Sequence, residues 1–289
     1  MCKSYRHPVQ QLHISTHPDT SIANPRRPIT FRIRTTSYNY RYFISFLVVS
    51  VLWYHPSPNY FTMSLAPVAP SSTTIRPFAV NVELHLQPER HDEFLQIIKY
   101  DAQQTIQNEP GAVQFTIGTD TNNENKFHLH EQYNTETDFD YHCTTEHFQK
   151  WQNFCNTKPF VSDPIVQFYQ CLNDRVLSPL SLSTTTSYCL NVELCIRPEV
   201  RDEFISVIQN NQLGSRTKEP LCVQYDYGES TTTPNHFYFH EQYIGKENGK
   251  EGFEQHTQSD HFKKWEDFVA TANPFTKDPV VRFFESIPY

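Results

Sequence analysis

The stretch Phe127-His-Leu-His-Glu-Gln-Tyr133 decides the fold of this chain, because it occurs twice among the 289 residues. The second copy is Phe237-Tyr-Phe-His-Glu-Gln-Tyr243. In both copies aromatic and aliphatic residues stand at alternate positions, as they do in a β-strand with one buried face. Each stretch precedes a segment, 141–151 or 255–265, in which His, His-Phe and Trp recur at helical spacing. Each copy therefore predicts a strand that leads into a helix.

The repeat extends well beyond this stretch. Residues 80–133 align with residues 190–243 at a constant offset of 110 without a gap, and 22 of the 54 aligned positions are identical. Such agreement indicates an internal duplication. In the first copy, alternation predicts strands at 80–86, 112–118, 127–133 and 163–169, and helical spacing predicts helices at 88–108 and 136–156. The order is β-α-β-β-α-β, which is that of a ferredoxin-like unit.

The predicted fold class is α+β, with two tandem ferredoxin-like β-α-β-β-α-β units. We place unit 1 at 78–171, a linker at 172–187 and unit 2 at 188–289. Helices on one face of a four-stranded sheet leave its other face open, and both faces carry apolar or aromatic side chains. Packing the two sheets face to face covers them, which predicts an internal pseudo-dimer. Association of such fused pairs into larger oligomers stays open.

Residues 1–77 form a predicted disordered or targeting leader. Residues 1–62 carry seven Lys or Arg against one acid, whereas the remainder carries 17 against 31. The apolar run 42–54 is too short to span a bilayer, so we predict no stable membrane insertion. Three interpretations stay open: a cleaved organelle-targeting leader, a late signal-type segment, or untranslated sequence before an alternative start at Met63. The predicted location is cytoplasmic, or an organelle if residues 1–62 are a cleaved leader.

Composition excludes several function classes. An acidic body repels phosphate backbones, so nucleic acid is not an expected partner. The seven cysteines include no Cys-x-x-Cys pair and are interpreted as reduced thiols. The seven glycines form neither a Gly-x-Gly-x-x-Gly motif nor a P-loop, which argues against a dinucleotide or nucleotide cofactor.

Three motifs resemble the antibiotic biosynthesis monooxygenase family of dimeric α/β barrels. They are Val82-Glu-Leu-His-Leu-Gln-Pro-Glu-Arg-His-Asp-Glu-Phe94, Phe-x-x-x-Glu-Gln-Tyr on the third strand, and His142 with His147-Phe148. The resemblance leans toward the quinol monooxygenases and the isomerases that process phosphorylated autoinducer-2. It implies subunits that pair through their sheets, a cavity between sheet and helices in each unit, and chemistry without metal, flavin or nicotinamide. The two copies differ at Asp101/Asn211 and Ala102/Gln212, where the isomerase-like relatives place polar and His side chains.

Polar residues kept in both copies are the candidate site residues. A histidine with a pKa near neutrality can deprotonate a phenol or an enol, and a neighbouring glutamate can fix its tautomer. The predicted catalytic residues are His142, His256, His130 and His240. The predicted substrate-binding residues are Asn81, Asn191, Glu83, Glu193, Trp151, Trp265, Tyr133 and Tyr243.

Other polar residues favour a structural interpretation. Glu131 and Glu241 stand on a mainly apolar strand face, which favours buried hydrogen-bonded pairs. The expected partner of His147 and His261 is a backbone carbonyl. No metal site is predicted, because Tyr238 replaces His128 in the second copy and because the step from His142 to His147 does not align on one helix.

The predicted function is a cofactor-independent monooxygenase that deprotonates a small electron-rich, quinol-like aromatic and lets the anion react with O₂. Two alternatives stay open: an isomerase of a small enolisable ketone, and a barrel that binds a small ligand or has a structural role without turnover. The expected partners are a small-molecule substrate and O₂.

Overall fold

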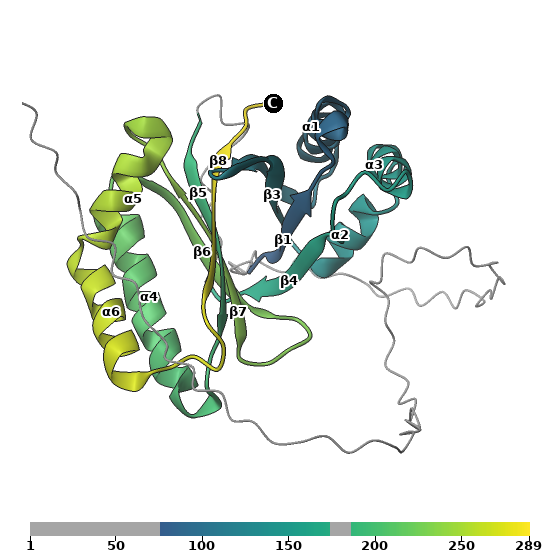
Figure 1. The fold of residues 1–289 in the computed structure, drawn as a ribbon. Coiled ribbons are helices and arrows are strands. Elements are labelled where there is room, and N and C mark those ends of the chain that lie inside the picture. The colour runs from purple at the N-terminus through teal and green to yellow at the C-terminus, as the bar shows by residue number, and fades with distance from the viewer. Residues whose placement is uncertain (1–75, 174–185) are drawn as a thin grey trace, which may run out of the picture. The chain divides into compact units, whose positions relative to one another are not determined.

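The computed structural model describes residues 76–173 and 186–289 (Figure 1). The predicted leader up to residue 75, with the run 42–54 and the alternative start at Met63, lies outside the described residues, as does most of the predicted linker. Among the helices described, none is long and apolar enough to cross a membrane.

Both units have the predicted element order. Unit 1 comprises β1 (Phe78–His85), η1 (Pro88–Arg90), α1 (His91–Asn108), β2 (Ala112–Asp120), β3 (Asn123–Tyr133), α2 (Glu136–His142), α3 (Glu146–Asn156) and β4 (Ile165–Cys171). Unit 2 comprises β5 (Tyr188–Cys195), η2 (Pro198–Val200), α4 (Arg201–Lys218), β6 (Cys222–Ser230), β7 (His236–Tyr243), η3 (Glu247–Gly249), α5 (Lys250–Thr257), α6 (Asp260–Ala272) and β8 (Val280–Ser286). The second helical segment of each unit, which was predicted only as helix-rich, consists of two helices.

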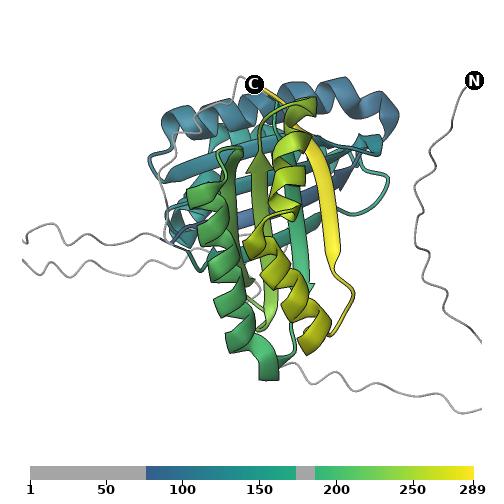
Figure 2. The same ribbon diagram turned by 90° about the vertical axis from the view of Figure 1, so that its left-hand side faces the viewer.

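The eight strands form one closed barrel. The strand order is β2-β3-β1-β4 in unit 1 and β6-β7-β5-β8 in unit 2. Antiparallel pairing of β2 with β8 and of β4 with β6 joins the two sheets into the barrel. α1 packs on α3 and β2, and α4 packs on α6 and β6, so the helices cover the outer face of each sheet (Figure 2). The predicted intramolecular α/β barrel of two ferredoxin-like units is confirmed.

The apolar core of each unit lies between its sheet and its helices. The rings of Phe94 on α1 and Phe127 on β3 lie 4.6 Å apart, and those of Phe204 and Phe237 in unit 2 lie 4.7 Å apart. All four side chains are fully buried. Each contributes about 1.5–3 kcal/mol through removal of its apolar surface from water. The strand faces that bear these residues are the ones that alternation grouped as apolar.

Two equivalent glycines allow the units to approach each other. Gly118 lies where β2 pairs with β8, and Gly228 lies where β6 pairs with β4. A Cβ at Gly118 would come 2.2 Å from the Phe284 ring, and one at Gly228 would come 2.2 Å from the Gln170 carbonyl oxygen. At these two positions the close approach of the strands leaves no room for a side chain.

Replacing Gly228 by alanine is expected to destabilise the barrel by about 1–3 kcal/mol, because the added methyl group meets backbone that cannot rotate away. Urea unfolding followed by circular dichroism measures this change. Thr233→Ala, at an exposed position in the loop after β6, is the control and should change stability by less than about 0.5 kcal/mol. Equal stability of Gly228→Ala and the control would show that this junction tolerates a side chain.

The segment 287–289 follows β8 and packs on unit 1. The Ile287 amide donates to the Ile117 carbonyl at 2.8 Å, and the Tyr289 hydroxyl donates to the Phe115 carbonyl. In unit 2 the equivalent carbonyl, that of Tyr225, accepts from the Gln212 side chain at 2.7 Å. Unit 1 has Ala102 in place of Gln212, so Tyr289 supplies the donor that the shorter side chain lacks.

Candidate functional site

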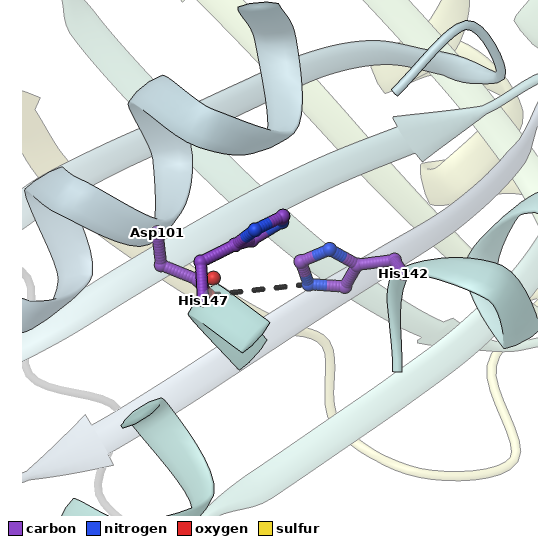
Figure 3. Close-up of side chains that lie close together, drawn as sticks. All are labelled: Asp101, His142 and His147. Atoms are coloured by element: carbon purple, nitrogen blue, oxygen red, sulfur yellow. Dashed lines mark ion pairs between the residues drawn. The ribbon is translucent and has the colours of Figure 1, made fainter. Parts of the chain in front are cut away.

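Two histidines in each unit meet because the second helical segment is broken. α2 ends at His142, and α3 begins after Thr145, whose hydroxyl accepts from the Phe148 amide at 3.3 Å and caps the new helix. The break turns the chain so that the rings of His142 and His147 lie 5.6 Å apart (Figure 3). Ser259 caps α6 in the same way, and the rings of His256 and His261 lie 5.8 Å apart. His142 and His147 are five residues apart and would not share a face of one helix. They meet because they lie on two helices, α2 and α3.

One glutamate holds both histidines of a unit. The Glu109 Oε1 atom accepts from His142 Nδ1 at 2.8 Å and from His147 Nε2 at 2.5 Å. In unit 2, Glu219 Oε1 accepts from His256 Nδ1 at 3.1 Å and from His261 Nε2 over a shorter distance. The prediction of a backbone carbonyl as the partner of His147 and His261 is therefore wrong.

Sequence reasoning missed Glu109 and Glu219. Each is the residue after the last turn of the first helix, and each has a backbone amide that still donates into that helix. A signal was present, because Glu-Pro stands at 109–110 and again at 219–220. The end of the helix accounts for the proline in each copy but does not require a glutamate before it. The glutamate kept in both copies was therefore the signal that indicated a role for this residue.

The units differ at the helix position that faces the first histidine. In unit 1 the Asp101 Oδ2 atom lies 3.9 Å from His142 Nε2 (Figure 3), and its buried Oδ1 atom has no hydrogen-bond partner in the described structure. In unit 2 the equivalent Asn211 donates to the Tyr225 hydroxyl at 3.0 Å. Unit 1 has Phe115 in place of Tyr225. Unit 1 thus pairs a carboxylate with its histidine, whereas unit 2 presents an amide and a phenol.

Burial and neighbouring charges tune the titratable groups of unit 1. Burial raises the pKa of Asp101 to about 7, although His142 opposes this. Burial lowers the pKa of His142, but its hydrogen bond to Glu109 and the nearby carboxylates outweigh burial and raise that pKa above its ordinary value. The pKa of each group is therefore shifted upward from its ordinary value, and shifts of this kind are typical of functional sites.

A buried glutamate and tyrosine stand beside each histidine. The Tyr133 hydroxyl donates to Glu131 Oε2 at 2.7 Å, and the Tyr243 hydroxyl donates to Glu241 Oε2 at the same distance. Burial raises the pKa of both glutamates. The predicted buried hydrogen-bonded pairs are confirmed.

Unit 2 contains a cavity of about 310 Å³ between its sheet and its helices. This volume is at the lower end of the range for small-molecule sites. Three polar side chains converge on it from three elements: Asn211 of α4, Glu241 of β7 and His256 of α5. The rest of the wall is mostly apolar or aromatic and includes Tyr225, Phe239, Phe253, Phe262, Trp265 and Phe283. Such a site suits a small, flat ligand with one or two polar groups.

The family model for antibiotic biosynthesis monooxygenases matches residues 77–153 and 187–267, which together make up more than half of the chain. This chain belongs to the antibiotic biosynthesis monooxygenase family. It carries two units of that family in tandem.

Solved structures share the fold of this family member at low sequence identity. A protein described as a candidate monooxygenase from Lactobacillus acidophilus NCFM is 13% identical, with a TM-score of 0.58 over 74% of this chain and 99% of its own. A second, from Fusobacterium nucleatum subsp. nucleatum ATCC 25586, is 13% identical, with a TM-score of 0.59 over 73% of this chain and 92% of its own. A protein described as anthrone oxidase-like is 11% identical, with a TM-score of 0.51 over 75% of this chain and 93% of its own. Comparison with curated proteins finds no match.

Four of the predicted site residues lie inside the barrel rather than at the unit 2 cavity. His130 and His240 stack with ring centroids 3.7 Å apart and planes 7° apart. Their Nδ1 atoms donate to Asn81 Oδ1 and Asn191 Oδ1 respectively, each at 2.8 Å. All four side chains are buried, and none lines the cavity of this family member.

The side-chain amides of the two asparagines also join the units across the barrel. Asn81 Nδ2 donates to the Phe239 carbonyl at 3.1 Å, and Asn191 Nδ2 donates to the Leu129 carbonyl at 3.4 Å. The four residues therefore form a polar contact between the two family units.

Glu83 and Glu193 occupy the same inner face, nearer the end of the barrel. Arg282 contacts both: its Nε atom donates to Glu83 Oε2, and its Nη1 atom lies 3.5 Å from Glu193 Oε2. Neither glutamate lines the unit 2 cavity.

The predicted aromatic residues surround the helix-side sites. Trp265 lines the cavity of unit 2. Trp151 packs edge-on against Phe94, with ring centroids 6.1 Å apart. Tyr133 and Tyr243 are fully buried and bond the glutamates beside the histidines. Of the residues predicted from sequence, the structure thus brings Tyr133 beside His142 and Tyr243 beside His256, and it places His256 and Trp265 in the wall of one cavity.

Three groups of side chains in the described structure have potential metal-ligand atoms within 4.8 Å of one another. They are Asp101 with His142 and His147, Glu219 with His256 and His261, and Glu193 with Cys195 and His236. In the first two, each histidine already uses one ring nitrogen to bond Glu109 or Glu219. The third group lies at the barrel end and has no counterpart with the same residue types in unit 1.

Proposed function

We propose that this chain is a cofactor-independent monooxygenase that oxidises a small, electron-rich, quinol-like aromatic. The observation that carries the proposal is the Glu219–His256 pair, which opens on the largely apolar cavity of unit 2. Membership of the antibiotic biosynthesis monooxygenase family supports an oxygenase class. One structural neighbour is described as anthrone oxidase-like, and an anthrone has the enolisable carbonyl that this chemistry requires.

The first step is proton removal from the substrate hydroxyl. The Nδ1–H group of His256 donates a hydrogen bond to Glu219, which leaves the Nε2 atom without a proton. Because His256 lines the cavity, this Nε2 atom serves as the base. The carboxylate then stabilises the imidazolium that forms. Asn211 and Tyr225 stand in the same wall and hydrogen-bond a substrate oxygen.

The second step is electron transfer from the substrate anion to O₂. The mostly apolar wall offers few hydrogen-bonding groups to the anion, so the anion is less well solvated there than in water and reacts more readily. Oxygen adds to the ring carbon that carries the excess electron density. Cleavage of the O–O bond leaves one oxygen on that carbon as a carbonyl, and the other leaves as water with two hydrogens from the substrate. The substrate supplies all the electrons, so no flavin or metal enters the balance.

A second candidate function is isomerisation of a small enolisable ketone. The observation that favours it is Asp101, whose carboxylate faces His142 Nε2 at 3.9 Å in unit 1. An acid and a base that face each other can remove a proton from one carbon and return it to the next. This chemistry requires no O₂.

Oxygen uptake by the purified full chain, after treatment with a chelator and without added cofactor, tests the proposal. A panel of hydroquinones, naphthols and anthrones supplies the substrates. We expect uptake of one O₂ per substrate and a quinone product that carries one atom of ¹⁸O from ¹⁸O₂. Deuterium exchange into enolisable ketones in D₂O without O₂ uptake would favour the isomerase. Ligand binding by calorimetry with neither activity would overturn both enzyme assignments.

A further inference from the structure

Two neighbouring strands of unit 2, β5 and β7, carry three potential metal ligands at the end of the barrel. Glu193 and Cys195 are two positions apart on β5, so they share the inner face of the barrel. Cys195 stands directly opposite His236 of β7 in the antiparallel register. Glu193 Oε1 lies 2.8 Å from His236 Nε2, and the potential ligand atoms of all three lie within 4.8 Å of one another.

We propose that Glu193, Cys195 and His236 form a binding site for Zn²⁺ that bridges β5 and β7. Carboxylate oxygen, thiolate sulfur and imidazole nitrogen are the three ligand types that Zn²⁺ takes in proteins. All three residues are partly exposed, which leaves room for water as the fourth ligand of a tetrahedral site. The Cys195 thiol loses its proton to solvent as the zinc–sulfur bond forms.

The surroundings orient the carboxylate for this role. Gln167 Nε2 donates to Glu193 Oε2 at 2.6 Å, and Arg282 Nη1 lies 3.5 Å from the same oxygen. These contacts hold one carboxylate oxygen and direct Oε1 toward His236. Such outer partners are typical of metal-binding carboxylates. Arg282 also bonds Glu83. Because this second carboxylate partly neutralises the guanidinium, Arg282 repels a metal cation at Glu193 less strongly.

Unit 1 shows the same backbone positions without the ligand set. The equivalents of Glu193, Cys195 and His236 are Glu83, His85 and Lys126. Lys126 Nζ lies 3.0 Å from Glu83 Oε1 and neutralises that carboxylate. In unit 2 the imidazole of His236 replaces this lysine, and the thiol of Cys195 replaces the imidazole of His85. In unit 1 Lys126 forms an ion pair with Glu83. In unit 2 no lysine stands at this position, so Glu193 can bind a metal cation instead.

Titration of the full chain with Co²⁺ tests the site, because a cobalt–thiolate bond gives a charge-transfer band in the near ultraviolet. We expect the band to saturate at one Co²⁺ per chain and to disappear when Zn²⁺ is added. Cys195→Ser should remove the band while the other six cysteines remain. His236→Lys, which copies unit 1, should weaken Co²⁺ binding by more than the roughly 10–100-fold cost of losing an outer-shell partner.

A gain-of-function variant is the matched control. His85→Cys combined with Lys126→His gives unit 1 the ligand types of unit 2, and this variant should bind a second Co²⁺ with a second thiolate band. Absence of a thiolate band in the wild type, or its persistence in Cys195→Ser, would overturn the proposal. Unchanged affinity in His236→Lys would remove the histidine from the ligand set and overturn the three-residue site. Far-ultraviolet circular dichroism confirms that each variant is folded.

Discussion

The double variant His142→Ala/His256→Ala is expected to lower the rate of substrate-dependent oxygen uptake by about 10²–10⁴-fold, the usual contribution of a general base. In each unit the histidine is held through Nδ1 by a carboxylate, Glu109 or Glu219, so its Nε2 atom is the nitrogen that would act as the base. Alanine removes the base and leaves the aromatic wall. The loss should therefore appear in kcat more than in KM.

The single variants separate the two units. His256→Ala removes the proposed base of the unit 2 cavity, and His142→Ala removes the equivalent histidine, which faces Asp101. The control is His91→Arg, because His91 lies on the surface of α1 and Arg201 stands at the equivalent position of α4. Wild-type turnover in the double variant, with substrate still bound, would exclude both histidines as the base.

Acid is expected to destabilise the barrel through the stacked histidines. Burial lowers the pKa of His130 to about 3 and the pKa of His240 well below its usual value. Between the unfolded pKa of about 6.5 and the folded pKa, the unfolded chain binds the additional proton. The contribution of these two histidines to stability is therefore fully present above about pH 6.5 and is lost as the pH falls below it. Each histidine contributes a slope of about 1.4 kcal/mol per pH unit.

A comparison with His130→Gln isolates this effect. Buried carboxyls with raised pKa values, such as Asp101 at about 7, act with the opposite sign, because the folded chain binds the additional proton there. These groups are common to both proteins and cancel in the difference. Urea unfolding at several values from about pH 6 to about pH 4 should show the wild type losing about 1.4 kcal/mol per pH unit more than the variant. Parallel pH profiles would show that His130 accepts a proton inside the folded barrel.

The fold could be predicted from sequence because every level of the pattern agrees. The period of two on strands such as 80–86, the helical spacing after Pro88 and the gapless repeat each indicate the same unit. The break between α2 and α3 could not be predicted from periodicity, because it depends on the hydroxyl of Thr145 restarting a helix three residues after the first one ends.

The candidate site was predicted only in part, for a reason of geometry. Asn81 and Glu83 stand on the polar face of β1, which in an open sheet would face solvent or a ligand. Here that face meets the polar face of the other unit inside a closed barrel. The cavity lies on the apolar face instead, where Glu241 is the polar exception on the strands and His256 comes from α5. Alternation separates the two faces correctly but does not indicate which of them meets the substrate.

Closure of the barrel within one polypeptide also frees the two halves to change independently. In a barrel made from two identical subunits, every substitution appears at both symmetry-related positions, so a change that benefits one pocket is imposed on the other. Here Asp101 can be an acid while Asn211 is an amide, and Lys126 can be a cation while His236 is an imidazole. The equivalent pairings of β2 with β8 and of β4 with β6 join the two units in the same way at both junctions. The two units thus share one fold, and their side chains can diverge one residue at a time.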